Sequence, residues 1–453
     1  MSAPTVVVVG AGLAGISAAL AAADAGAEVV LVERQNRIGG LTWSFRRRGL
    51  WFDNGQHVFL RCCTAYRGFL DRIGASGQTI LQDRLDIPVL EPGGARATIA
   101  RSPLPSPLHL GPSLARYRHL SLRDRIRLVR PALALRRLDL ADPALDQVTF
   151  GAWLTRQGQS PEAIERLWNL IVLPTVNVPA GEASLALAAK VFRTGLLHRA
   201  DAGDLGWSAV PLAELHAGNG GRALDDAGVE TVLGCRVRSV ARETDGRLLV
   251  ATPGRDLRAE SVIVATPPEV AQAVLPPGVL PPMGGLGASP IVNVHLVLDR
   301  KVTDLPVAAA VGSPAQFVFD RTESAGATTG QVLAVSLSAA DAYIGSRPEE
   351  LIRTFAGAIG DLFPAARRAG LVDGVVSREH NATFRGRPGT AALRPPSLTG
   401  VDGLFLAGAW CDTGWPATME GAVRSGVGAA ALAVGSPAPS SGRRARELQG
   451  VRS

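Results

Sequence analysis

This chain has few cysteines, few aromatic residues and almost no lysine. Its four cysteines among 453 residues show neither a disulfide framework nor the spacing of metal ligands, so we expect a reduced chain without a metal site. No apolar run reaches the roughly 20 residues that a membrane-spanning helix needs. The first apolar run starts at residue 6, which leaves no room for a signal peptide before it. These shortages predict a cytoplasmic protein with no metal and no spanning helix.

The positive charge is nearly all arginine, because only Lys190 and Lys301 are lysines, and the net charge is +7. Between residues 101 and 140, nine arginines stand against two aspartates and are interleaved with Leu, Ile, Val and Pro. Residues 120–130 of this segment predict a basic amphipathic helix. Such a helix is typical either of a surface that lies on an anionic membrane or of a solvated cap-domain helix. Nucleic acid is not an expected partner, because aromatic residues are sparse here and no recognition motif is present.

The start of the chain carries the pattern of a dinucleotide-binding turn. The apolar run 6–9 leads directly into Gly10, Gly12 and Gly15, and Glu33 follows a second apolar run. Gly10 permits a tight turn, Gly12 lets the backbone approach a pyrophosphate, and Gly15 lets the next helix pack on the strand. Phosphates would lie against free N–H groups at the helix N-terminus. Glu33 is placed to accept hydrogen bonds from a ribose, which disfavours NADP.

The residues that follow this acid favour FAD among the dinucleotides. Arg34 comes next, and the paired glycines Gly39 and Gly40 then follow at the spacing with which FAD enzymes wrap the phosphates from a second side. Residues 234–240, which include Val237, resemble the strand beside the adenine. Residues 261–268 resemble the strand and Ala-Thr-Pro turn that close such a domain.

A distant segment predicts the other end of the same cofactor. The apolar run 404–407 ends at Gly408, and a helix-like run begins beyond residue 416. The N-terminus of that helix, with Ala417 and Met419, is expected to direct its N–H groups at the flavin ring or the ribityl chain. Two distant parts of the chain would therefore hold the two ends of one FAD.

Over nearly its whole length the sequence resembles the superfamily of FAD-dependent amine oxidases and phytoene desaturases. Within it, the chain is most similar to the squalene-associated FAD-dependent desaturases, which are hydroxysqualene dehydroxylases. This closer resemblance is carried by residues 52–60, 64–66, 69–70, 107–110, the arginine-rich span, 168–177 and 416–426.

The resemblance implies that reduced FAD delivers a hydride that replaces the allylic hydroxyl of hydroxysqualene, in the biosynthesis of squalene and hopanoids. Because that isoprenoid is apolar and resides in the bilayer, the resemblance also favours peripheral contact of the arginine-rich span with an anionic membrane, at its inner face. Association with other enzymes of the squalene pathway is a further expectation.

Two positions depart from the family pattern. Relatives usually carry Arg after the paired glycines, where this chain has Leu41, and an acid after Gly408, where it has Ala409. In the family that acid binds ribityl hydroxyls, and Asp412 is a candidate replacement. Loss of the family acid at position 409 is expected to weaken FAD binding by about 1–3 kcal/mol. Neither change removes the phosphate cradle, so FAD remains the predicted cofactor.

A polar turn at residues 53–57 supplies the candidate catalytic residues. His57 titrates near neutrality and is predicted to help the hydroxyl leave, while Gln56 and Asn54 would orient the hydroxyl or an edge of the flavin. The alternative is that this turn only satisfies backbone groups. Lys190 is interpreted as a cation at a helix end.

The predicted architecture is an α/β FAD-binding, Rossmann-like domain of amine oxidase type, with an interleaved α+β substrate domain that has a helical, membrane-facing portion. The first domain comprises residues 1–85, 219–284 and 381–435, and the second comprises 86–218 and 285–380. Alternation at 292–298 predicts an antiparallel sheet under an apolar cavity, and the tail 436–453 is expected to be disordered.

Three functions remain open from the sequence. The first is an FAD-dependent oxidoreductase of the hydroxysqualene dehydroxylase type. The second is a carotenoid (phytoene-type) desaturase or an amine oxidase. The third is a non-catalytic prenyl-binding protein of the same architecture, which Leu41 and Ala409 keep open.

Overall fold

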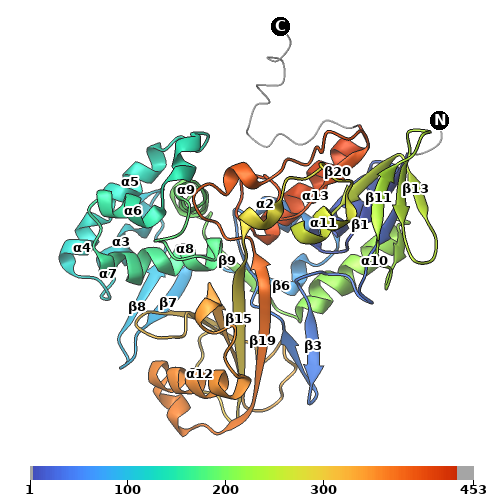
Figure 1. Ribbon diagram of the computed structural model, residues 1–453. Helices are drawn as coiled ribbons and strands as arrows, with labels where there is room; N and C mark the ends of the chain where they lie inside the picture. The colour runs from blue at the N-terminus through green and yellow to red at the C-terminus, as the bar shows by residue number, and fades with distance from the viewer. Residues whose placement is uncertain (1–3, 436–453) are drawn as a thin grey trace.

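The computed structural model describes residues 4–435, so the tail predicted at 436–453 lies outside the described residues. Figure 1 shows three regions: a parallel sheet with its helices at the upper right, a helical region at the upper left, and a second sheet with α12 below. Segments from both ends of the chain meet in the first region, where β1, β20 and α13 lie together.

The first region is built on a five-stranded parallel sheet with the order β10-β2-β1-β14-β20. Its central strand contains the predicted valine run, which is buried on both faces as parallel strands usually are. The strands are β1 (Thr5–Val9), β2 (Glu28–Val32), β10 (Glu230–Val232), β14 (Ser261–Val264) and β20 (Leu404–Leu406).

Helices α1 (Leu13–Asp24) and α13 (Met419–Ala433) pack directly against each other on this sheet. Their backbones approach so closely that a Cβ on Gly426 would lie 2.1 Å from the carbonyl oxygen of Ala14. Because α1 follows β1 and α13 follows β20, both helices begin beyond the carboxyl ends of their strands.

The second sheet has seven strands in the order β19-β15-β18-β17-β16-β7-β8. The predicted antiparallel strand at 292–298 is confirmed, because β15 pairs antiparallel with both β18 and β19. The strands are β7 (Asp86–Leu90), β8 (Arg96–Ala100), β15 (Ser289–Leu298), β16 (Val307–Ala310), β17 (Phe317–Asp320), β18 (Gln331–Ser338) and β19 (Leu371–Thr383). Helix α12 (Pro348–Leu362) packs on β15 and β19.

The helical region lies between β8 and β9 in the chain and packs around buried aromatic and aliphatic side chains, among them Tyr117, Phe150 and Leu135. Its helices are α3 (Gly111–Ala115), α4 (Leu122–Arg127), α5 (Val129–Arg137), α6 (Phe150–Arg156), α7 (Pro161–Ala163), α8 (Asn169–Val176) and α9 (Leu185–Phe192), which continues into the π-helical turn η5 (Arg193–Leu197). The predicted basic helix is α4, which Ser121 caps by accepting a hydrogen bond from the Asp124 N–H. Among the helices of residues 4–435, none has both the length and the hydropathy needed to cross a bilayer.

Three small sheets and the remaining helices complete the described chain. The strands are β3 (Ser44–Arg47), β4 (Leu50–Asp53), β5 (Val58–Leu60), β6 (Thr79–Leu81), β9 (Leu205–Ser208), β11 (Ser239–Arg242), β12 (Leu248–Ala251) and β13 (Leu257–Ala259), and the helices are α2 (Thr64–Arg72), α10 (Asn219–Asp226) and α11 (Pro268–Val274).

The predicted strand at 234–240 is wrong, except for its last two residues, which begin β11. The backbone at the start of this segment bonds to the turn after β2, and only from Arg238, whose N–H donates to the Ala251 oxygen, does it bond to β12. The N–H of Gly234 donates to the Gln35 oxygen, and that of Cys235 donates to the Glu33 oxygen. Val237 is buried within this loop.

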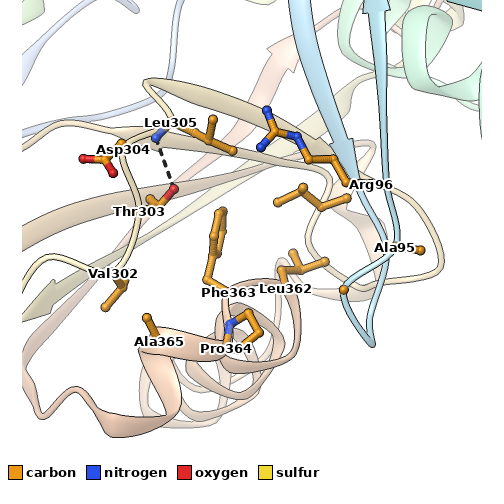
Figure 2. Close-up of a pocket in the computed structure, with 12 residues that line it drawn as sticks. Ala95, Arg96, Val302, Thr303, Asp304, Leu305, Leu362, Phe363, Pro364 and Ala365 are labelled. Carbon is orange, nitrogen blue, oxygen red and sulfur yellow. Dashed lines mark hydrogen bonds between the residues drawn. The ribbon is translucent and has the colours of Figure 1, made fainter.

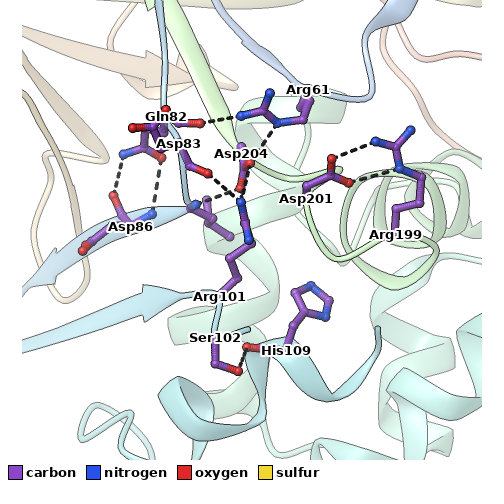
Figure 3. A network of polar contacts seen from close by, with 11 residues as sticks. Arg61, Gln82, Asp83, Asp86, Arg101, Ser102, His109, Arg199, Asp201 and Asp204 are labelled. Atoms are coloured by element: carbon purple, nitrogen blue, oxygen red, sulfur yellow. Dashed lines mark hydrogen bonds and ion pairs between the residues drawn. The ribbon is translucent and has the colours of Figure 1, made fainter. Parts of the chain in front are cut away.

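A buried carboxylate joins the β5-β9-β6 sheet to the entrance of the helical region (Figure 3). The side chain of Asp204 has no exposed surface and forms ion pairs with Arg61 at 2.9 Å and Arg101 at 2.6 Å. It also accepts a hydrogen bond from the N–H of Leu85 at 2.8 Å. One acid therefore fixes the ends of three chain segments relative to one another.

Candidate cofactor and reaction site

The glycine loop after β1 has the geometry that its three glycines predict. Gly10 has φ of +100°, and a Cβ there would lie 2.6 Å from the carbonyl oxygen of Ala265. A Cβ on Gly15 would lie 1.8 Å from the carbonyl oxygen of Gly10, so only glycine lets α1 approach the loop. Gly12 is different, because a Cβ there would meet no protein atom closer than 3.9 Å. A methyl group at Gly12 would therefore fit without displacing any protein atom.

The paired glycines lie against this loop. The N–H of Gly39 donates to the Ala11 oxygen at 2.7 Å, and a Cβ on Gly40 would lie only 2.8 Å from the Gly12 Cα. The Glu33 carboxylate accepts a hydrogen bond from the Ala11 N–H at 2.8 Å. Two bare stretches of backbone therefore face each other at the N-terminus of α1, which is a fitting cradle for a pyrophosphate.

Arg37 is a residue of this cradle that the sequence reasoning missed. Its guanidinium donates to the Gly40 oxygen at 3.0 Å and lies over the Trp43 ring. Burial lowers the pKa of Arg37 from its ordinary value. Arg34, the predicted cofactor residue, is exposed instead, and Leu41 is 47% exposed. The signal for Arg37 was its position three residues before Gly40.

At the other end, the turn after β20 is built around Gly408. This residue has φ of +149°, and its N–H donates to the Ser425 hydroxyl at 2.8 Å. The Trp410 ring packs against it and donates to the Thr266 oxygen at 2.9 Å, which joins the ends of β20 and β14. Thr418 caps α13 by accepting from the Gly421 N–H. Ala417 and Met419 thus lie at the helix N-terminus, as predicted from the sequence.

A buried arginine supports the segment where the family acid is replaced. Arg394 is 6% exposed, and its guanidinium donates to the backbone oxygens of Ala409, Trp410 and Cys411. Burial lowers its pKa, which the nearby Asp412 opposes. Asp412 accepts a hydrogen bond from the Gly414 N–H at 3.2 Å. The turn that carries Ala409 is therefore held from behind by Arg394, a residue with no sequence signal.

The polar turn after β4 is held firmly by its surroundings. Asn54 is 1% exposed; its side chain accepts from the Trp43 N–H and donates to the Leu41 oxygen and to Glu379. These contacts hold the turn in place, which agrees with the alternative that its polar residues only satisfy neighbouring backbone and side-chain groups. Asp53 forms a buried ion pair with Arg321 at 3.0 Å.

Strand β15 places two polar side chains beneath this turn. Asn293 donates to the backbone oxygen of Asn54 at 3.1 Å, and His295 donates through Nε2 to that of Asp53 at 3.0 Å. Burial lowers the pKa of His295 to about 4, so the ring is neutral at pH 7. Both residues belong to the alternation at 292–298 that predicted this strand, but the sequence did not mark them as supports of the polar turn.

His57 and Gln56 keep polar atoms without partners inside residues 4–435. The Gln56 Nε2 is buried and unpaired, and His57 forms one hydrogen bond, from Nδ1 to the Gly55 oxygen at 3.2 Å. A carbonyl only accepts, so Nδ1 carries the proton and Nε2 of the neutral ring is an acceptor. Burial lowers the pKa of His57, so the ring is mostly uncharged at pH 7. His57 can therefore hold a hydroxyl at neutral pH and donates a proton mainly in acid.

Lys190 lies against the turn that opens α13. Its Nζ is 5.0 Å from the centroid of the Trp415 ring, and the Arg424 guanidinium is 5.3 Å from the same ring. Arg424 pairs with Glu420, whereas Lys190 forms no ion pair within residues 4–435. Burial and the nearby Arg424 lower the pKa of Lys190. A half-buried ammonium group, which sequence reasoning took for a helix-end cation, therefore faces the predicted flavin end.

A cavity of about 420 Å³ lies elsewhere, between the β7–β8 hairpin and the end of α12 (Figure 2). Leu90, Leu362 and Phe363 form its apolar wall, with Arg96 at its edge. It contains none of the predicted site residues. Within residues 4–435, no cluster of three or more side chains is suited to hold a metal ion.

Comparison with known sequences assigns the chain a family. The sequence profile of the family described as flavin containing amine oxidoreductase matches residues 13–434. The hydroxysqualene dehydroxylase of Zymomonas mobilis is 28% identical over 94% of this chain and 98% of its own length. That of Rhodopseudomonas palustris is 30% identical over the same shares. The zeta-carotene desaturase of Zea mays is 25% identical over 93% of this chain and 82% of its own length.

Solved structures share the fold at lower sequence identity. A putrescine oxidase double mutant superposes with a TM-score of 0.71 at 20% identity, over 95% of this chain and all of that one. The cyclohexylamine oxidase of Brevibacterium oxydans gives a TM-score of 0.70 at 21% identity, over 96% and 99% of the two chains. These similarities extend over the parallel sheet, the second sheet and the helical region together.

Proposed function

Because this chain belongs to the flavin-containing amine oxidoreductase family and is an FAD-dependent oxidoreductase, we propose that it reduces hydroxysqualene to squalene. The observation that carries this proposal is the similarity, over nearly the full length of both chains, to hydroxysqualene dehydroxylases at up to 30% identity. Reduced FAD supplies the hydride that replaces the allylic hydroxyl. The hydroxyl leaves as water, so the protein must provide one proton.

The geometry of the two glycine-rich turns supports the cofactor residues that we propose. Gly12 and Gly40, with the N-terminus of α1, would hold the pyrophosphate against backbone N–H groups. Glu33 would bind the ribose, while its carboxylate also fixes the loop through Ala11. At the other end, the N-terminus of α13, with Met419 in its first turn, would direct its N–H groups at the flavin.

Two groups are candidates for the proton. His57 holds the substrate hydroxyl through Nε2 and transfers a proton when the ring is protonated, because its Nδ1 is already committed to Gly55. Lys190 is the second candidate, because it is a half-buried cation without a carboxylate partner beside Trp415. In both cases the allylic cation needs little stabilisation beyond exclusion of water, which apolar walls supply.

The substrate portion comprises the helical region and the seven-stranded sheet. Partly buried apolar side chains on α8 and α9, such as Ile171 and Val191, suit a long hydrocarbon chain. Lys190 lies on α9 of this portion, and the polar turn at 53–57 bonds to its strand β15. These two sites supply the polar groups that we propose for the reaction.

Anaerobic incubation of the FAD-loaded, photoreduced protein with hydroxysqualene tests the proposal. We expect squalene by mass spectrometry, and we expect none when the protein is oxidised before mixing. Absence of squalene from the photoreduced protein would overturn the proposed reaction, and desaturation of phytoene or zeta-carotene, or peroxide release from an amine, would identify a different one.

Carotenoid desaturation is the second candidate function, favoured by the 25% identity to the Zea mays zeta-carotene desaturase. The two reactions run in opposite redox directions. Desaturation needs oxidised FAD and an acceptor, whereas removal of a hydroxyl needs reduced FAD. Assays that start from the two flavin states with the matching substrates therefore separate them.

A further inference from the structure

One helix surface of the helical region has no partner although it is apolar. Of thirteen large apolar side chains that are exposed within residues 4–435, six lie between residues 104 and 133. Four of these are 40–66% exposed and recur at the spacing i, i+4, i+7 and i+11, which is one face of a helix. They are Leu122, Ile126, Val129 and Leu133, which we call the outer stripe.

Helices α4 and α5 present this stripe as one nearly continuous helix. The Leu128 N–H donates to the Asp124 oxygen, and the Ala132 N–H donates to the Leu128 oxygen, so the hydrogen bonding continues across the junction. The opposite side is also apolar, with Leu128 and Leu135 buried in the core. In Figure 1 α4 lies at the left edge of the helical region, and α5 lies above it. The core is therefore filled by the opposite side of these helices, and packing within the chain does not explain why the outer stripe is apolar.

The charges beside the outer stripe are of one sign. Residues 116–137 contain eight arginines and one acid, Asp124, which is buried and bonded to Ser121. Arg123, Arg127 and Arg130 form no ion pair within the described chain, and all three are exposed. An aliphatic stripe flanked by unpaired arginines matches the boundary between acyl chains and anionic headgroups.

We infer that α4 and α5 dock this protein on an anionic bilayer, with the outer stripe inserted below the headgroups and the flanking arginines bound to lipid phosphates. A second copy of the chain fits this surface less well, because the arginines of two copies would repel each other. Nucleic acid fits less well too, because the stripe offers no aromatic ring on which bases could stack.

The docking surface is one helix away from the predicted flavin end. Turn η5 packs on α5, and Arg193 donates to the Leu138 oxygen at 2.5 Å. The same helical run carries Lys190 against Trp415. The inference rests on the proposed function, because an isoprenoid that resides in the bilayer explains why this region should reach a membrane.

Vesicle sedimentation of the full-length protein tests the docking surface. The wild type should pellet with vesicles of phosphatidylglycerol and phosphatidylcholine, and much less with phosphatidylcholine alone. Changing the outer stripe to serine, L122S/I126S/V129S/L133S, should weaken binding at least about tenfold. A control with the same chemistry elsewhere, L371S/V372S/L398S, should bind as the wild type does, because those side chains are also exposed but lie outside the basic surface.

Two further measurements separate insertion from adsorption. A polarity-sensitive dye on I126C should shift to the blue on anionic vesicles, and the same dye on V372C should not. The charge variant R123Q/R127Q/R130Q should lose the preference for phosphatidylglycerol.

The inference is overturned if the wild type stays in the supernatant, or if the serine variant pellets equally well. It is also overturned if the wild type is a dimer that the serine variant dissociates without any change in vesicle binding, because the stripe is then an interface between copies.

Turnover of hydroxysqualene in detergent micelles distinguishes failure of docking from failure of the proposed function. The serine variant should match the wild type in micelles and lose turnover only when the substrate is supplied in vesicles. If the wild type makes no squalene in micelles, the proposed function fails, and the sedimentation result still decides the docking surface.

Discussion

The different surroundings of Gly12 and Gly15 allow cofactor binding to be separated from folding with two single substitutions. Gly15→Ala places a Cβ 1.8 Å from the Gly10 oxygen, so the backbone of α1 or of the loop must shift. We expect a loss of more than about 3 kcal/mol in the free energy of unfolding. Gly12→Ala meets nothing closer than 3.9 Å, and the φ of −75° and ψ of −178° at Gly12 suit alanine.

For Gly12→Ala two small effects on stability oppose each other. Alanine is a poorer N-cap than glycine, but it lowers the entropy of the unfolded chain by about 0.4–1 kcal/mol. The net change in the free energy of unfolding should stay within about 1 kcal/mol. The added methyl group occupies the space beside the α1 N-terminus, so at least one charge-assisted hydrogen bond to a phosphate is lost. That loss is worth about 1.5–3 kcal/mol, or a roughly 10–150-fold weaker affinity for FAD.

The assay uses flavin-stripped proteins. Urea denaturation followed by circular dichroism gives stability, and titration with FAD followed by quenching of flavin fluorescence gives affinity. Gly68→Ala is the matched control, because an added Cβ there meets nothing within 4 Å and the residue lies on α2. Wild-type FAD affinity in Gly12→Ala would refute the assignment of Gly12 to the pyrophosphate. A stability loss as large as that of Gly15→Ala would refute the structural reasoning.

Three other predictions follow from buried charges and histidines. Because burial lowers the pKa of His57, kcat/KM should rise as pH falls below about 6.5 if His57 is the acid. His57→Gln should then flatten the pH profile. A profile that is flat through neutrality, with activity lost in Lys190→Met, would assign the proton to Lys190. Asp204→Asn leaves Arg61 and Arg101 without their acid and should cost about 3 kcal/mol of stability, measured by urea denaturation, whereas an unchanged midpoint would contradict the role of this ion pair. The pKa of His295 falls from 6.5 in the unfolded chain to about 4 in the folded one. The free energy of unfolding should therefore be highest above pH 6.5 and fall by about 1.4 kcal/mol per pH unit as pH falls toward 4. His295→Gln should reduce that slope in urea melts between pH 6 and 4, and an identical slope would refute the role of His295.

The sequence predicts best what is local. The loop from Gly10 to Gly15 lies within a few residues of the strand and helix that it joins, so spacing alone indicated its geometry. The antiparallel strand β15 was also predicted from its own residues, whereas its partners β18 and β19, which come later in the chain, were not. The predicted Arg34 is exposed, and the bond from Arg37 to the Gly40 oxygen is a contact that the order of the residues does not indicate.

The residues that the sequence did not indicate act across the chain. Glu379 bonds to Asn54 and Arg321 to Asp53, at separations of 325 and 268 residues. Arg394 supports a turn fifteen to seventeen residues away through backbone oxygens, which leave no trace in residue type. Such contacts depend on the tertiary arrangement of β15, β19 and β20, and no single segment encodes them.

The parallel sheet also dictates when this protein can first hold its cofactor. Its central strand β1 is made among the first residues, but β14 and β20 pair beside it only after residues 264 and 406. At about 5–20 residues per second, β20 leaves the ribosome roughly 20–80 s after β1. The glycine loop lacks Ala265 until β14 has been made, and it lacks α13 across α1 until after β20. Nascent chains therefore present an unfinished sheet with an open edge until the C-terminal strand arrives.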